Sequence, residues 1–171
     1  MVDKKQLTIR KATLSDVSQI KELFFKYFGE MAERRGALKC LDSYIVAEDN
    51  GKIVAISGIV DKSDSLYDGY EVAWTCCDEE YRHKGIVTNI LKQCIEKLPD
   101  DGVPVYCDCW RVNFNEKTNL DSTMKNLGMK LFYINIAVYN KDYISVCRTC
   151  PYRNDSERCH CVMDLYRKER K

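Results

Sequence analysis

Apolar residues recur along the chain with two spacings, one typical of strands and the other of helices. Alternating apolar residues, or many β-branched and aromatic residues, predict strands at 7–10, 43–48, 52–60, 69–77, 103–109 and 131–139. Apolar residues three or four positions apart predict helices at 17–31, 86–98 and 116–127. The predicted element order is therefore β-α-β-β-β-α-β-α-β.

Short local signals mark where these elements begin and end. Thr13 to Asp16 resembles the capping box that precedes a helix, and Asn50-Gly51 is a strong hairpin signal because both residues tolerate positive φ. Pro99 ends the second predicted helix. Gly128 closes the third at a plausible C-terminal capping position.

Length and charge narrow the classes of function. The 171 residues suit one domain that buries a core without disulfides, and 27 Lys and Arg nearly balance 26 Asp and Glu. The chain therefore has no large excess of positive charge that would favour nucleic-acid binding. The sequence has neither a signal-peptide pattern nor a run of about 18 apolar residues that would span a membrane. We expect a cytoplasmic protein without nucleic-acid or membrane partners, in which the ten cysteines are reduced thiols or metal ligands.

A basic cluster stands directly before the second predicted helix. Arg82, His83 and Lys84 precede Gly85, which opens that helix after a strand that ends near Cys77. The amides of a first helical turn lack partners and carry about half a positive charge, so this loop predicts a phosphate-binding site. The alternative is a solvated basic turn without a ligand.

The same stretch resembles the signature of the GNAT superfamily of acyl-CoA-dependent N-acetyltransferases. The family pattern is Gln/Arg-x-x-Gly-x-Gly/Ala, and Arg82 to Val87 follows it except at Val87, where the family prefers glycine or alanine. Leu127-Gly128-Met129 is similar to the family's Leu-Gly-Phe, and the resemblance covers roughly residues 7–139. It implies an α/β (α+β) fold with a mixed, mostly antiparallel central sheet flanked by helices.

The resemblance also implies an activity and a cosubstrate. Acetyl-CoA would donate an acetyl group to a primary amine of a small molecule or protein, by direct attack of the amine. An asparagine before the fourth helix contacts the cofactor in the family, and Asn115 and Asn119 are candidates for it. The implied cofactor-binding residues are Trp74, Thr75, Cys76, Cys77, Arg82, His83, Lys84, Gly85, Ile86, Val87 and Asn115.

Two residues are candidates for proton transfer. Glu71 lies eleven residues before Arg82, the offset of the general-base glutamate in family members that acetylate histones, although it also fits a solvated strand edge. Alternation places Glu71 on one strand face and Val72, Trp74 and Cys76 on the other. Met124 stands where many members have a tyrosine acid, so Tyr133 is the candidate donor, unless the thiolate leaves without assistance.

Aromatic residues offer candidates for the wall of an acceptor pocket. Tyr27, Phe28, Tyr67 and Tyr70 are the residues considered for it. The first two also fit the apolar stripe of the first predicted helix, and therefore the core.

A polar, cysteine-rich tail follows residue 140, so the chain divides into an acetyltransferase domain at 1–140 and an extension at 141–171. Cys147, Cys150, Cys159 and Cys161 have a spacing that suits a tetrahedral zinc site or an iron–sulfur cluster. Structural thiols or a redox pair are the alternatives. The tail, Val87 and Met124 together keep open a non-catalytic acyl-CoA-binding or metal- or redox-sensing module, and a homodimer is compatible with either function.

Overall fold

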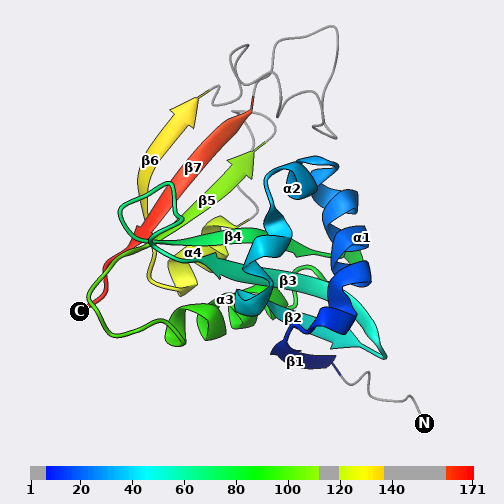
Figure 1. The fold of residues 1–171 in the computed structure, drawn as a ribbon. Coiled ribbons are helices and arrows are strands. Elements are labelled where there is room, and N and C mark those ends of the chain that lie inside the picture. The colour runs from blue at the N-terminus through cyan, green and yellow to red at the C-terminus, as the bar shows by residue number, and fades with distance from the viewer. Residues whose placement is uncertain (1–6, 112–119, 137–160) are drawn as a thin grey trace, which may run out of the picture.

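The computed structural model describes residues 7–111, 120–136 and 161–171, which build one seven-stranded sheet (Figure 1). The strand order is β1-β2-β3-β4-β5-β7-β6, and every neighbouring pair is antiparallel except β4 and β5. This arrangement confirms the predicted fold class. The strands are β1 (Leu7–Lys11), β2 (Ile45–Asp49), β3 (Lys52–Val60), β4 (Tyr70–Cys77), β5 (Val105–Arg111), β6 (Lys130–Ile136) and β7 (Val162–Lys168).

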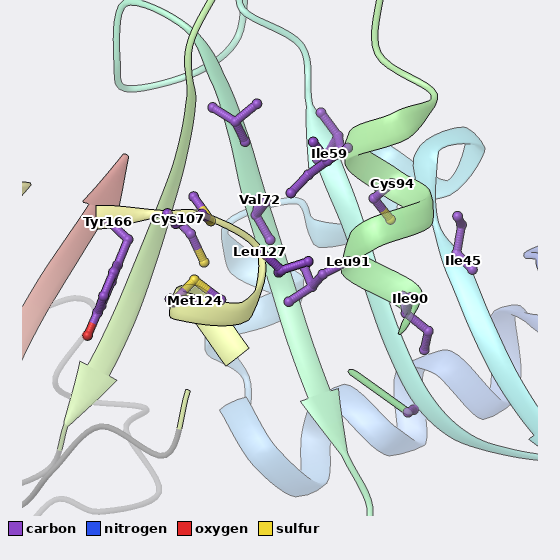
Figure 2. Packing of buried hydrophobic residues seen from close by; sticks show 14 of the residues in the cluster. Ile45, Ile59, Val72, Ile90, Leu91, Cys94, Cys107, Met124, Leu127 and Tyr166 are labelled. Carbon is purple, nitrogen blue, oxygen red and sulfur yellow. The ribbon is translucent and has the colours of Figure 1, made fainter. Parts of the chain in front are cut away.

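Helices cover both faces of the sheet. One face packs against α3 (Ile86–Glu96) and α4 (Asp121–Asn126), and the other against α1 (Val17–Phe28) and α2 (Met31–Arg34). Figure 2 shows Ile90, Leu91 and Cys94 of α3 pointing toward the strands of the first face. Three 3-10 segments complete the described helical structure: η1 (Leu14–Asp16), η2 (Ala37–Ser43) and η3 (Glu79–Tyr81).

Alternation along the strands builds the two cores. The buried residues between the sheet and α3 form one cluster, the α3 face cluster, and those between the sheet and α1 form a second, the α1 face cluster. Ile45 and Ala47 of β2 pack in the α3 face cluster, while Val46 between them packs in the α1 face cluster. All three side chains are buried, because a strand with helices on both sides has no solvent-facing row. The hairpin after β2 is confirmed, with positive φ at Asn50 and Gly51.

Two predicted helices differ in extent from those of the structure. The helix predicted over 17–31 ends at Phe28, because Gly29 adopts a φ of 58°, and the chain resumes as α2. The helix predicted over 116–127 is described only from Asp121, as α4. Among the described residues no helix is both long and apolar enough to cross a bilayer.

The last strand is a correction to the sequence analysis. The sequence predicts that Val162–Lys168 belongs to an extension outside the domain, but as β7 it lies between β5 and β6 and pairs with both. Its pattern is obscured by Asp164, a buried charge that pairs with Arg111 on β5 at 2.8 Å. The division expected after residue 140 falls within residues that the structure does not describe.

Candidate active site

The two parallel strands separate partway along their length. β4 pairs with β5 only from Tyr70 to Val72, opposite Val105 to Cys107, although both strands continue beyond these residues. Figure 1 shows β5, β7 and β6 fanning away from β4. A cavity of about 700 Å³ occupies this opening and extends to the start of α3.

A β-bulge shapes the β4 wall of the cavity. Ser57 of β3 lies opposite both Trp74 and Thr75, and Trp74 has a φ of 57°, which is rare for a bulky residue. The bulge reverses the alternation, so Val72 packs on the α3 face while Trp74 and Cys76 pack on the α1 face. The prediction that all three side chains share one face is therefore wrong.

Asp78 anchors the loop that follows β4. Its amide donates to Val54 O at 2.8 Å, and its buried carboxylate lies 2.7 Å from Lys26 Nζ and 3.0 Å from Lys52 Nζ. Burial favours a higher pKa for Asp78, but hydrogen bonds from Lys26, Lys52 and Tyr27 outweigh it and lower the pKa. The loop therefore starts from a fixed, ionised carboxylate.

The loop leads to the N-terminus of α3 with its backbone donors open. His83 and Gly85 have φ values of 60° and 73°, a turn that orients successive amides as in anion-binding nests. Within the described chain, the amides from His83 to Thr88 donate to no backbone carbonyl, whereas Asn89 N–H donates to Gly85 O at 3.0 Å. Six consecutive residues around Gly85 therefore have open donors, at the place where the sequence predicts a phosphate-binding site.

Two basic side chains of the loop, Arg82 and Lys84, contact residues of the protein itself. Arg82 Nε donates to Cys77 O at 3.1 Å, and its guanidinium carbon lies 5.2 Å from the Tyr27 ring centroid. Lys84 Nζ lies 5.1 Å from the Tyr81 ring centroid. Arg82 thus ties the loop to the end of β4, while the positive charge stays exposed beside the open amides.

Most of the predicted cofactor-binding residues line this cavity. Lys84 is exposed beside it without lining it, and Asn115 and Asn119 lie outside the described residues. Val87 lines the cavity and also packs against the α3 face cluster, so its branched side chain stabilises the helix start. The predicted residues that line the cavity are Trp74, Thr75, Cys76, Cys77, Arg82, His83, Gly85, Ile86 and Val87.

The two predicted catalytic residues lie away from the cavity lining. Glu71 is half-buried on β4, and its Oε2 accepts from Leu66 N–H at 3.2 Å and from Ser65 Oγ at 3.4 Å. Tyr133 lies on β6 and is 59 % exposed. Met124, in the place of the family tyrosine, is fully buried.

The predicted metal site falls mainly on residues that the structure does not describe. Cys147, Cys150 and Cys159 lie in that part of the chain, and Cys161 is buried directly before β7. Among the described residues no three His, Cys, Asp or Glu side chains are arranged to hold a metal ion. The four-cysteine site stays a prediction.

The cavity wall includes Asp108, which was not predicted from the sequence. Asp108 of β5 lines it, and burial raises the pKa of its carboxyl to about 6. Tyr27 and Phe28, which fit either the core or a pocket, both line the cavity and pack against the α1 face cluster. A lone aspartate in the apolar run 105–110 was the one signal for Asp108.

Comparison with solved structures supports the fold. An N-acetyltransferase from Staphylococcus aureus Mu50 is similar with a TM-score of 0.69 and 14% identity, over 97% of this chain and 99% of that chain. A mosquito arylalkylamine N-acetyltransferase like 5b has a TM-score of 0.66 and 14% identity, over 96% and 100%. The ribosomal-protein-S18-alanine N-acetyltransferase from Escherichia coli has a TM-score of 0.66 and 14% identity, over 96% and 94%.

Comparison of the sequence with curated proteins finds no match. The model of the acetyltransferase (GNAT) family matches residues 14–119. This range includes β4, α3 and the loop of residues 78–85 between them, here called the anion loop. That match spans more than half of the chain, and the strand opening and open amides described above lie within it. The chain therefore belongs to the acetyltransferase (GNAT) family and is an acetyltransferase.

Proposed function

We propose that this enzyme transfers the acetyl group of acetyl-CoA to a primary amine of a small molecule or protein. The observation that carries the proposal is the row of open amides from His83 to Thr88, which borders the cavity between β4 and β5. The diphosphate of the cosubstrate would bind these amides, and its pantetheine arm would lie between the separated strands. Acetyl-CoA supplies an activated acyl carbon to the bound amine.

Direct attack by the amine fits the chemistry of the cavity better than an acyl-enzyme intermediate. Cys76 and Cys77 both line the cavity, but burial raises the pKa of the Cys77 thiol to about 11 and raises the pKa of the Cys76 thiol well above its usual range. Because the thiolate is the nucleophilic form, both thiols are inert at neutral pH. We therefore infer that the acyl group passes to the acceptor in one step.

Other assignments from the sequence stay predictions within this function. Glu71 is the candidate base by resemblance, and Tyr133 is the candidate acid because Met124 replaces the family tyrosine. Lys84 and Asn115 are the remaining predicted cofactor contacts. A homodimer also stays a prediction, which the molecular mass in solution tests. Zinc and iron analysis of the purified protein tests the metal site of Cys147, Cys150, Cys159 and Cys161.

Calorimetric titration with acetyl-CoA and with S-acetylpantetheine, which lacks the diphosphate, tests the cosubstrate site. We expect saturable binding of acetyl-CoA with a Kd below about 1 mM, and binding of S-acetylpantetheine at least about tenfold weaker. Equal affinities for acetyl-CoA and S-acetylpantetheine would show that the open amides do not bind the diphosphate. Release of CoA thiol with a panel of amines tests the transfer, and tight binding without thiol release for any amine would favour the non-catalytic module.

A further inference from the structure

Asp108 stands at the point where the parallel strands part. The last residue of β5 that pairs with β4 is Cys107, opposite Val72, so Asp108 is the first residue of β5 beyond the pairing. Asp108 lines the cavity together with Trp74 and Thr75 of the bulge on the opposite strand. A carboxylate at this place borders the space between the two strands.

A tyrosine holds this carboxylate in position. Tyr67 Oη donates to Asp108 Oδ1 at 2.6 Å, and the Tyr67 ring stacks on Tyr106 with centroids 5.0 Å apart and planes 25° apart. Tyr106 is itself buried in β5, two residues before Asp108. Tyr67 therefore holds Oδ1, whereas within the described residues Oδ2 of Asp108 receives no hydrogen bond.

Burial, a tyrosine and two charged neighbours set the pKa of Asp108. Burial is the largest influence and raises the pKa of its carboxyl, the Tyr67 hydroxyl lowers it, the negative charge of Glu71 raises it, and Arg35 after α2 lowers it. Arg111 of the same strand also lines the cavity, but it pairs with Asp164 of β7. The pKa of about 6 leaves Asp108 ionised at neutral pH and still a stronger base than an ordinary aspartate.

We propose that Asp108 is the catalytic residue that accepts a proton from the ammonium form of the acceptor, and that Tyr67 positions it. This inference rests on the proposed acetyl transfer. The geometry favours Asp108 over Glu71, because Glu71 is outside the cavity lining and its carboxylate accepts from Leu66 N–H. Glu71 then acts on the site through its charge alone.

The protons of the reaction balance with one base. The ammonium gives one proton to Asp108 and becomes a neutral amine, whose nitrogen forms a bond to the acyl carbon as the carbon–sulfur bond breaks. A second proton leaves the nitrogen and ends on the CoA thiol, and the third stays on the amide product. Asp108 then releases its proton to solvent, so the net products are amide, CoA thiol and one proton.

The test compares pH profiles of kcat/KM for thiol release by the parent enzyme, Asp108→Asn and the exposed control Asp100→Asn. The parent is expected to lose activity on the acid side with a midpoint near 6. Asp108→Asn should lower kcat/KM about 100-fold or more and remove this limb, with acetyl-CoA binding unchanged, while Asp100→Asn matches the parent. The amine's own titration lies at higher pH and is common to all variants.

Two further variants distinguish Asp108 from its neighbours by the direction of the shift. Tyr67→Phe removes a hydrogen bond that stabilises the carboxylate, so the acid midpoint should rise by about one pH unit. Glu71→Gln removes a like charge, so the midpoint should fall. Both shifts are independent of Asp108→Asn and remain measurable if that variant fails to fold.

The outcomes separate this inference from the proposed function. A parent enzyme that binds no acetyl-CoA, or releases no thiol, refutes the proposed acetyl transfer itself. The role of Asp108 is refuted if the parent is active but Asp108→Asn keeps the same acid limb. It is also refuted if the acid midpoint does not shift in Tyr67→Phe. If Glu71→Gln loses the acid-side limb of the pH profile while Asp108→Asn keeps it, Glu71 is the base.

Discussion

Gly85 and Gly102 form a matched pair of residues for testing the anion loop. Their φ values are 73° and 70°, and a Cβ atom added at either would meet no heavy atom within 4 Å. Alanine at each position should therefore cost about 1–2 kcal/mol of unfolding free energy through the left-handed backbone alone. Gly85→Ala should in addition weaken acetyl-CoA binding, because its methyl group would enter the space beside the open amides.

Urea unfolding and calorimetric titration measure the two effects on the same proteins. Gly102→Ala controls for the loss of stability, since Gly102 lies after α3 and outside the cavity. Equal acetyl-CoA affinities in the two variants would contradict a cosubstrate site at the start of α3.

Individual residues show where sequence reasoning reached its limit. The loop residues were predictable because Gly85 and its basic neighbours mark a helix start by local chemistry. The positive φ of Trp74 was not, because it arises from a bulge that adds one residue of β4 opposite Ser57, and no residue type signals it. Asp108 was missed for a similar reason, since its position is defined by a strand separation and not by a motif.

A carboxylate network joins β1 to the start of α1. Asp16 is buried, accepts from both terminal nitrogens of Arg10 at 2.7 and 2.8 Å, and accepts from Thr13 N–H at 2.7 Å. Hydrogen bonds from Arg10, the largest influence, lower the pKa of Asp16 well below its usual range. Glu48 of β2 also pairs with Arg10, so the network spans two strands and η1.

Asp16→Asn should destabilise the fold by about 2–3 kcal/mol at pH 7. The folded-state pKa is depressed, so the stabilisation is complete above the unfolded pKa of about 3.9 and is lost as pH falls below it. The difference in unfolding free energy between parent and variant should therefore shrink between about pH 4 and pH 2. Urea unfolding across this range measures it.

The exposed Asp100→Asn is the control for a changed carboxylate, because it should leave stability within about 0.5 kcal/mol of the parent at every pH. A difference between Asp16→Asn and the parent that does not depend on pH would show that packing, rather than charge, accounts for the loss.

Elements with strong local signals were predictable, and those set by distant partners were less so. The hairpin of β2 and β3 follows from Asn50-Gly51, and α3 follows from its apolar stripe, which packs on the sheet in Figure 2. Their boundaries agree with the predictions within a few residues. By contrast, β7 carries a buried charge and pairs with strands far away in sequence, so its pattern looks polar.

The whole molecule depends on a strand order that local patterns do not contain. β4 and β5 are the one parallel pair of the described sheet, and they part after three residues. β5 stays in the sheet because β7 pairs with it along its whole length from Val105 to Arg111. The opening that holds the cavity therefore needs β7 to hold β5 on the opposite side.

A chain that ends at residue 161 should lose its cooperative fold, while one that ends at residue 168 should keep it. The shorter chain lacks Val162, Leu165 and Tyr166, which are buried, and each such side chain contributes about 1.5–3 kcal/mol. Their sum approaches the total stability of a typical domain, about 5–15 kcal/mol. Removal also leaves β5 and β6 without the strand that joins them. Circular dichroism during thermal unfolding measures the result, and a cooperative transition in the shorter chain with acetyl-CoA binding intact would contradict a structural role for β7 in opening the site.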